Sequence, residues 1–284
     1  MEKLTDTNTD AHSMDSLFLK RQVCVDFYFS PGKIDLNDVR LLLINDGQDL
    51  ITMNFEKIIR QLYQEEQIYP LLCVGIHCGE DRKNEYGTAN ILNHKGQGAK
   101  AALYSNFIFN ELIPFIKRTY NITTFSEKSF CGFSLGGLSA LDIVWNHPKK
   151  FSKVGVFSGS LWWRSLSEND PAFSDEVHRI MHNEIKKGDY YPWLKFFFEA
   201  GTLDEAADRN GNGIIDSIDD TLSLIDELSQ KGYDTATDIH YLQISGGRHN
   251  VGTWALAFPE FLKWGWRKRA ISNEQKTMEN KHRQ

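Results

Sequence analysis

Hydrophobic and polar positions follow two patterns along this chain. Short, nearly continuous apolar runs occupy residues 23–30, 40–46, 70–77, 128–133, 153–159, 193–201 and 238–245, and we predict a β-strand for each. Apolar residues at helical spacing lie between them, at 55–64, 103–120, 135–148, 217–232 and 253–266, with a further helical region ending near residue 187. Because strands that are apolar throughout suit a sheet buried on both faces, we expect an α/β fold with a mostly parallel central sheet and helices on both faces.

The two ends of the chain lack these patterns. We expect residues 1–18 to be a flexible N-terminus and residues 269–284 to be a polar tail, because neither has a sustained apolar stripe. Neither a linker rich in Pro, Gly and Ser nor an internal repeat separates the segments between them. Residues 19–268 are therefore predicted to form a single domain.

Composition and charge narrow the possible partners. The 284 residues carry a formal net charge of −6 without a basic stripe, so nucleic acid is not expected as a partner. No stretch approaches ~18 uninterrupted apolar residues, so no membrane span is expected. The sequence shows no secretory signal, and its four cysteines form no CxxC pair, which favours a cytoplasmic location, although a trimmed chain would look the same. The oligomeric state cannot be read from the sequence.

A glycine-rich turn follows the apolar run at 128–133. The residues Gly132-Phe133-Ser134-Leu135-Gly136 fit the G-x-S-x-G pattern between a strand and a helix. This is the setting of a nucleophile elbow, in which a sharp turn presents a serine hydroxyl above the sheet. Ser134 is therefore the candidate nucleophile. The alternative is a tight turn in which Ser134 only caps the following helix.

A serine nucleophile needs a base, and the base needs an orienting carboxylate. His249 lies in a Gly-rich turn after the last predicted strand, and His77, which also ends a strand, is its rival. Asp204 follows the strand at 193–201 and gives the chain order serine, acid, histidine that this fold uses. Glu205 and Asp208 are near enough to compete with it. If the acid only caps a loop, a Ser-His dyad remains.

An oxyanion hole requires backbone N–H groups that point at the developing negative charge. The N–H of Leu135, directly after the candidate nucleophile, is one expected donor. The second is expected from the NDGQD segment at 45–49, with the N–H of Gln48 as the candidate. The alternative is a plain β-turn, because Asn, Asp and Gly favour turns in any protein.

Residues 208–219 read DRNGNGIIDSID and have the spacing of an EF-hand calcium loop. Gly213 stands where the sharp turn needs a glycine, and the segment resembles the calcium loops of dockerins more than those of calmodulin. We expect a structural calcium ion that pins the loop of the acid, and no cofactor for catalysis. The alternative is an Asx-rich loop in which Ser217 and Asp220 cap the next helix. The predicted ligands are Asp208, Asn210, Asn212, the carbonyl of Ile214, Asp216 and Asp219.

Five segments in order carry a family resemblance: DGQD, GFSLGG, SGSLWW (158–163), EAGTLDE (199–205) and GGRHNVGTW (246–254). Together they resemble the putative-esterase family of α/β-hydrolases, which includes esterase D, the enterochelin esterases and feruloyl or acetyl-xylan esterases. The resemblance covers roughly residues 20 to 267. It implies the α/β-hydrolase fold and an acyl-enzyme mechanism with Ser134, His249 and Asp204.

The resemblance also implies a substrate pocket. Arg82, Glu85 and Tyr86 match a recurrent R-x-x-E-Y segment expected near the pocket mouth, and Trp162 and Trp163 are expected to line the pocket unless they belong to the core. The expected substrate is a small-molecule or carbohydrate-linked ester. Alternatives are an acyltransferase of the same fold and a catalytically silent module that binds carbohydrate or siderophore.

Overall fold

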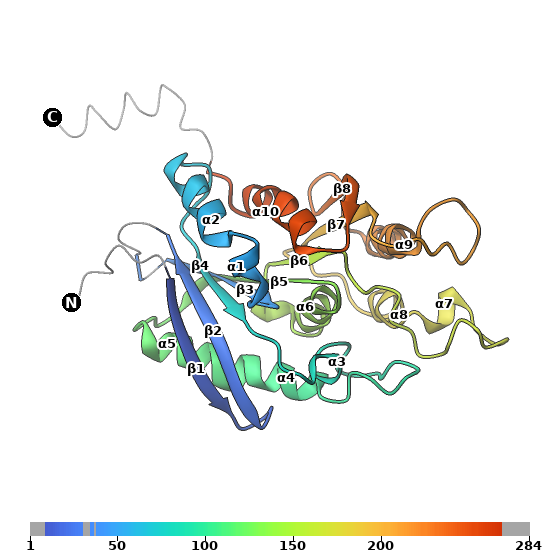
Figure 1. The fold of residues 1–284 in the computed structure, drawn as a ribbon, viewed down its shortest axis with the longest axis horizontal. Coiled ribbons are helices and arrows are strands. Elements are labelled where there is room, and N and C mark those ends of the chain that lie inside the picture. The colour runs from blue at the N-terminus through green and yellow to red at the C-terminus, as the bar shows by residue number, and fades with distance from the viewer. Residues whose placement is uncertain (1–8, 31–34, 37, 269–284) are drawn as a thin grey trace.

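One eight-stranded sheet organises the protein, described by a computed structural model for residues 9–30, 35–36 and 38–268 (Figure 1). The strands follow the order β1-β2-β4-β3-β5-β6-β7-β8. The strands β1 and β2, and likewise β2 and β4, pair antiparallel, whereas all pairs from β4 and β3 through β8 are parallel. The expected mostly parallel sheet is therefore confirmed. The strands are β1 (Thr9–Ser16), β2 (Arg21–Phe29), β3 (Val39–Asn45), β4 (Leu72–Ile76), β5 (Phe125–Phe133), β6 (Lys153–Phe157), β7 (Lys195–Leu203) and β8 (Ile239–Arg248).

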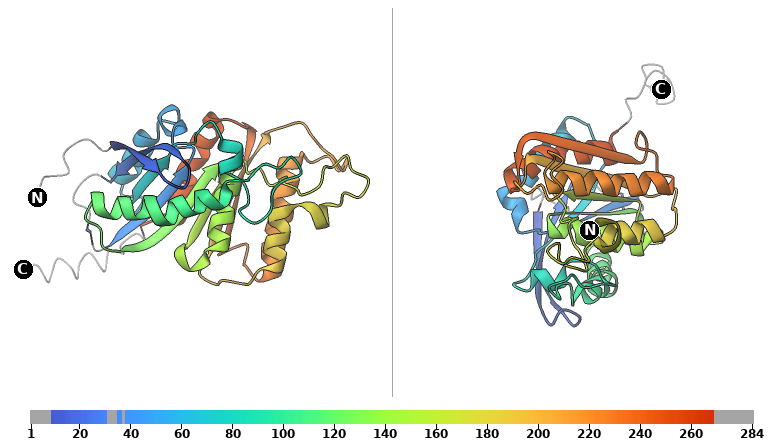
Figure 2. Two further views of the ribbon diagram at one scale, coloured as in Figure 1. Left: turned by 90° about the horizontal axis from the view of Figure 1, so that it is seen from below. Right: turned by 90° about the vertical axis from the view of Figure 1, so that its right-hand side faces the viewer.

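Helices cover both faces of this sheet, as Figures 1 and 2 show. One face carries α1 (Asp49–Thr52), α2 (Phe55–Gln64) and α10 (Val251–Trp266). The other carries α4 (Ala101–Phe107), a π-helical turn (Ile108–Leu112), α5 (Ile113–Thr119), α6 (Leu135–Asn146), α8 (Ile180–Lys187) and α9 (Asp216–Lys231). Three short elements join them, α3 (Arg82–Glu85), α7 (Asp175–His178) and a 3-10 turn (Pro148–Lys150). None of the helices in the described ranges is both long and apolar enough to cross a membrane.

The apolar strands are buried because successive side chains point to opposite faces that are both covered. In β3, Leu41 and Leu43 pack against the α6 side, whereas Leu42 and Ile44 pack against the α10 side. The same alternation places Phe196 and Phe198 of β7 on one side of the sheet and Phe197 on the other. This two-sided core explains why the strands read as continuous apolar runs.

The expectation of a flexible segment over 1–18 is wrong for residues 9–16, which form β1. This strand pairs with β2 from Thr9↔Tyr28 to Ser16↔Arg21. It is a largely exposed edge strand, so its polar side chains carry no apolar alternation that the sequence pattern could detect. Tertiary contacts hold it: Ser16 donates a hydrogen bond to Glu111 at 2.5 Å, and the His12 ring lies 5.4 Å from that of Phe115. The expected tail at 269–284 lies outside the described residues.

Candidate active site

Ser134 lies in a strained turn between β5 and α6. Its backbone has φ 54° and ψ −123°, a conformation that a non-glycine residue rarely adopts. The turn brings strand and helix so close that a Cβ on Gly132 would lie 2.4 Å from the carbonyl oxygen of Gly136. The side chain makes no capping hydrogen bond to α6, so the simple helix-cap interpretation does not apply. The strained backbone holds a partly exposed serine at the carboxyl edge of the sheet.

The loop after β3 packs directly against this turn. Asn45 donates a hydrogen bond from Nδ2 to the carbonyl oxygen of Gly136 at 2.7 Å, and a Cβ on Gly136 would lie 2.5 Å from Asp46 Oδ2. Within the described part of the chain, neither the backbone N–H of Gln48 nor that of Leu135 donates to a protein acceptor. Two unpaired backbone donors therefore flank the same turn, which is the donor type that an oxyanion hole uses.

Arg82 holds the Gln48 loop in place. Its guanidinium makes two hydrogen bonds of 2.7 Å to the buried carboxylate of Asp46, whose backbone is in the left-handed region at φ 59°. The Asp46 N–H donates to the hydroxyl of Tyr86 at 3.2 Å. Arg82 also donates to the carbonyl oxygen of Phe133 at 3.3 Å and so joins the loop to the elbow.

Two residues of the R-x-x-E-Y segment that were predicted to lie at the pocket, Glu85 and Tyr86, are buried in the interior instead. Tyr86 is fully buried, and Glu85 is 1% exposed and paired with Arg21 through hydrogen bonds of 2.8 and 2.7 Å. The expectation that these two side chains line the pocket is therefore wrong, since a buried ion pair and a buried ring have no open face. Arg82 remains partly exposed above them.

The two tryptophans also differ from each other. Trp163 is 1% exposed and belongs to the hydrophobic core, where its ring packs so closely on Gly87 that a Cβ there would lie 2.8 Å away. The expectation that Trp163 lines a pocket is therefore wrong. Trp162 packs against the same core but keeps part of its surface exposed. Its role in a pocket stays a prediction.

His249 follows β8 and lies close to the elbow through an aromatic contact. Its ring centroid is 5.5 Å from that of Trp254, which in turn stacks at 4.9 Å on Phe133, the residue before Ser134. Partial burial lowers the pKa of His249; the negative charge of Asp204 acts against this, and the positive charge of Arg82 adds to it. The imidazole is therefore within electrostatic range of both Asp204 and the Arg82 group at the elbow.

Hydrogen bonds within the predicted triad are not formed among the described residues. Ser134 Oγ lies 3.4 Å from Ser160 Oγ, and Asp204 Oδ2 accepts from the N–H of Gly201 at 3.0 Å. The structure thus brings the serine turn, the imidazole and the carboxylate to one edge of the sheet without joining them.

The rivals for base and acid have other partners. His77 is hydrogen-bonded to Asp26 of β2 at 2.7 Å, on the antiparallel side of the sheet. Asp208 accepts from two backbone N–H groups of its own loop, and Glu205 is exposed. Among the three acids, Asp204 is the one whose charge acts on His249.

Three polar residues near this edge were not assigned from the sequence: Ser158, Ser160 and Glu199. All three are buried, and they stand in the SGSLWW and EAGTLDE segments quoted for the family resemblance. The sequence signal that could have identified them is a polar residue at the end of an apolar strand, where burial requires a hydrogen-bond partner.

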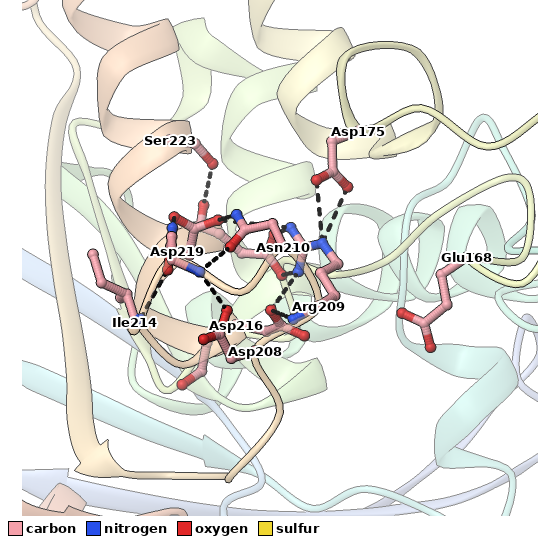
Figure 3. A network of polar contacts seen from close by, with 12 residues as sticks. Glu168, Asp175, Asp208, Arg209, Asn210, Ile214, Asp216, Asp219 and Ser223 are labelled. Carbon is pink, nitrogen blue, oxygen red and sulfur yellow. Dashed lines mark hydrogen bonds and ion pairs between the residues drawn. The ribbon is translucent and has the colours of Figure 1, made fainter.

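The loop at 208–219 is folded around its own side chains, as Figure 3 shows. The Asp208 carboxylate accepts from the backbone N–H groups of Asn212 and Gly213 at 3.1 and 2.9 Å. The Asp219 carboxylate accepts from the side-chain amides of Asn210 and Asn212 at 3.2 and 3.1 Å. Four of the predicted ligand side chains therefore converge.

Asp216, the fifth predicted side-chain ligand, is bound by Arg209, whose guanidinium also lies 4.0 Å from Asp219. It accepts from the backbone N–H of Arg209 at 3.0 Å and lies 3.2 Å from its guanidinium (Figure 3). The same guanidinium also pairs with Asp175 and Asp220. Over the residues that the structure describes, no group of three or more His, Cys, Asp or Glu side chains is placed to hold a metal ion. The fit to calcium is therefore partial: two carboxylates and two amides converge, and Arg209 occupies the third carboxylate.

Comparison with known proteins gives one family. A model described as Putative esterase matches residues 18–264. Among solved structures, enterochelin esterase from Shigella flexneri is 20% identical with a TM-score of 0.68, over 91% of this chain and 59% of that chain. The siderophore hydrolase EstB from Aspergillus nidulans is 16% identical with a TM-score of 0.65, over 93% of this chain and 97% of that one.

A ferulic acid esterase has the same fold, with 14% identity and a TM-score of 0.65 over 90% of this chain and 96% of that chain. This chain spans about three fifths of the Shigella flexneri esterase, so that protein's activity is not transferred as a whole. The family model, by contrast, covers most of the chain. The protein therefore belongs to the Putative esterase family and has its α/β-hydrolase fold, a membership that supports an ester hydrolase.

Proposed function

We propose that this protein is a serine carboxylic-ester hydrolase that works through an acyl-enzyme on Ser134. The observation that carries the proposal is the strained Ser134 turn flanked by the unpaired N–H groups of Leu135 and Gln48. A backbone this strained persists only where the surrounding structure enforces it, and such strain gathers at functional sites. Two free donors beside a nucleophile suit the tetrahedral intermediate of acyl transfer.

The reaction begins with attack of Ser134 Oγ on the ester carbonyl carbon while His249 takes the hydroxyl proton. Asp204 orients the imidazole and stabilises its charged form. The carbonyl oxygen becomes an oxyanion that the two backbone N–H groups stabilise, and His249 then returns its proton to the leaving alcohol. Water, deprotonated by His249, attacks the acyl carbon. The bond between this carbon and Ser134 Oγ then breaks, His249 returns its proton to Ser134 Oγ, and the acid leaves. Ser134 Oγ must turn from Ser160 toward His249 for the first step.

The test is the loss of hydrolysis when the nucleophile is removed. Ser134→Ala should lower kcat for a p-nitrophenyl acyl ester by roughly 10³-fold or more, because no other group can form the acyl-enzyme. A fluorophosphonate probe should label the native protein and not the variant. Ser126→Ala, which changes an exposed serine, is the matched control. Unchanged hydrolysis in folded Ser134→Ala protein would refute the assignment.

The substrate class is proposed from the site and the neighbours together. Structures of the Shigella flexneri esterase were determined in the presence of enterobactin and of 2,3-dihydroxy-N-benzoyl-serine. We propose a small-molecule or carbohydrate-linked ester whose carbonyl carbon fits beside Ser134. Parallel assays with acetyl, feruloyl and catecholate esters would identify the acyl group, and product analysis with an added alcohol would separate hydrolysis from acyl transfer.

We further propose that the loop at 208–219 binds a structural calcium ion. Asp208, Asn210, Asn212 and Asp219 would hold it together with the carbonyl oxygen of Ile214, since carboxylate and amide oxygens are the ligands that Ca²⁺ prefers. The two asparagine amides now donate to Asp219, and their oxygens accept from the backbone N–H groups of Asn212 and Ile214. Binding of the ion would require both amides to rotate so that their oxygens face it. Asp216 is held by Arg209 and is left out of this ligand set.

A further inference from the structure

A buried glutamate lies beneath the candidate triad. Glu199 stands near the carboxyl end of β7 and is 1% exposed. Its neighbours Phe198 and Ala200 point to the α6 side, so its side chain points to the α10 side together with Phe197 and the position of Gly201. This is the side of the sheet on which Trp254 contacts His249. An ionised carboxylate buried here without a cation would be costly.

The partners of Glu199 satisfy only half of its carboxyl group. Ser158 Oγ donates to Oε2 at 3.4 Å and itself accepts from Trp254 Nε1 at 2.9 Å. Oε1 is buried and has no hydrogen-bond partner in the described structure. Burial first, and then the charge of Asp204, raise the pKa of Glu199 to about 8. At neutral pH the group is therefore mostly protonated and has a proton to donate.

Asp204 offers an acceptor of the matching kind. Its Oδ2 accepts from the N–H of Gly201, but Oδ1 is buried and has no partner among the described residues. Asp204 Oδ1 lies 2.7 Å from the position that a Cβ on Gly201 would take. Gly201 is two positions after Glu199 in β7, so the two residues share one face of the sheet. Two unpaired carboxyl oxygens thus belong to the same end of β7, where the missing side chain of Gly201 lets Asp204 Oδ1 and the Gly247 backbone approach the strand closely.

We propose that Glu199 is a positioning residue of the hydrolase, which keeps its carboxyl proton and donates it toward Asp204 Oδ1. A hydrogen bond through this proton gives a partner to both unpaired oxygens, Glu199 Oε1 and Asp204 Oδ1. It fixes the orientation of the Asp204 carboxylate, which in turn orients His249. The inference rests on the proposed function and adds to it a fourth group that touches no substrate. Ionisation of Glu199 places a second negative charge beside Asp204 and removes the donor, so activity should fall at alkaline pH.

The surroundings of Glu199 contain few other charges. Asp204 is the charged group that acts on it, and Tyr241 of β8 is the nearby titratable group that Glu199 influences. Glu199 accepts a hydrogen bond from Ser158, which directly follows β6. Ser158 in turn accepts a hydrogen bond from Trp254 of α10. Burial and the two carboxylates raise the pKa of Tyr241 to about 12, so Tyr241 stays neutral over the range in which Glu199 titrates.

The test compares Glu199→Gln with Glu199→Leu. The amide keeps a neutral donor, so Glu199→Gln should hold kcat/KM at pH 7 within about threefold of the native value and lack the alkaline fall near pH 8. Glu199→Leu leaves Asp204 Oδ1 without a donor and should lower kcat/KM roughly tenfold or more. Asp142→Asn is the matched control, because Asp142 is another buried acid with a pKa raised to about 7, on α6 and bonded to Ala89 and Asn146.

An infrared measurement separates this inference from the proposed function. The native protein at pH 7 should show carbonyl stretching absorption of protonated carboxyl groups from both Glu199 and Asp142. Glu199→Gln should remove one component of this absorption, and Asp142→Asn should retain that component while removing the separate contribution of Asp142. The inference is overturned if the absorption is unaffected by Glu199→Gln, or if native and Gln proteins share the same alkaline fall in kcat/KM. If Ser134→Ala shows that no hydrolysis depends on the serine, the proposed function fails, and the infrared result still decides the protonation of Glu199.

Discussion

At the scale of single residues, the site depends on close approach between backbones. The Ser134 turn, the Asp46 loop and the Arg82 guanidinium meet within hydrogen-bonding distance of one another or of shared neighbours. This arrangement places no substrate-binding demand on Glu85 or Tyr86, which instead support it from the interior. Small side chains at the contact are therefore as important to the site as the reactive ones.

Gly136→Ala tests this close approach. The added Cβ would lie 2.5 Å from Asp46 Oδ2 and 3.0 Å from Asn45 Cβ, so the Gln48 loop must shift. We expect a loss of about 1–3 kcal/mol in the free energy of unfolding from overpacking, together with lower kcat as the oxyanion donors separate. Gly265→Ala in α10 is the control, because its nearest neighbour is 3.5 Å away and alanine should stabilise the helix by up to about 1 kcal/mol. Urea denaturation and ester kinetics measure both, and equal behaviour of the two variants would contradict the packing argument.

At the scale of elements, the loop before α9 connects the candidate acid to the outer helices. Arg209 ties this loop to Asp175 of α7 (Figure 3) and to Asp220 of α9. Arg179, which lies between α7 and α8, pairs with the same Asp220. Because this network is partly to largely buried, its ion pairs are less screened than surface pairs. The loop is thus anchored to the helices through Arg209, which also lies 4.0 Å from Asp219 in the part of the loop where we propose that calcium binds.

Calcium should stabilise the protein through that part of the loop. With Ca²⁺ far above its dissociation constant, we expect the melting temperature to rise by about 5 °C or more over that in a chelator, because binding favours the folded state. Asp208→Asn and Asp219→Asn should each abolish most of this rise. Asp226→Asn, at an exposed position of α9, should preserve it. Equal melting temperatures of the native protein with Ca²⁺ and with chelator would exclude the calcium proposal.

At the scale of the whole molecule, three buried titratable groups link stability to pH. Burial raises the pKa of Asp142 to about 7 and that of Glu199 to about 8, and burial lowers the pKa of His182 to about 3. The carboxyl groups bind more protons in the folded chain, so their contribution falls as pH rises from about 4 toward 8. His182 binds more protons in the unfolded chain, so its contribution falls as pH decreases from about 6.5 toward 3.

Above pH 7.5 the histidines are almost neutral in both the folded and the unfolded chain, so the two carboxyl groups give a measurable prediction. Between pH 7.5 and 8.5 the free energy of unfolding should fall by about 1 kcal/mol, since each group contributes at most about 1.4 kcal/mol per pH unit. Urea denaturation at the two pH values measures the change. Asp142→Asn and Glu199→Gln should each reduce it, and their combination should nearly remove it; a flat or rising native profile would contradict the assignment.

The amino-acid sequence alone determined the layered architecture. Seven of the eight strands and the main helices follow from apolar runs and helical spacing, because burial on both faces of a sheet selects apolar residues at every position of a strand. The G-x-S-x-G turn was equally visible, since its glycines are demanded by local contact between Gly132 and Gly136. Local steric requirements and two-sided burial both constrain residues that are adjacent in the chain, so both can be recognised from the sequence.

Only the tertiary structure decided which polar side chains meet. The strand β1 is held by an edge pairing and by contacts with Glu111 and Phe115, to which its own polar residues give no clue. Glu85, Tyr86 and Trp163 were expected at a pocket and are buried, and the burial of Glu199 and its interaction with Asp204 could not be read from the EAGTLDE segment in which both stand. The physical reason is that burial, charge coupling and hydrogen-bond partners depend on residues that are far apart in the chain, as with Ser16 and Glu111 or Phe133 and Trp254.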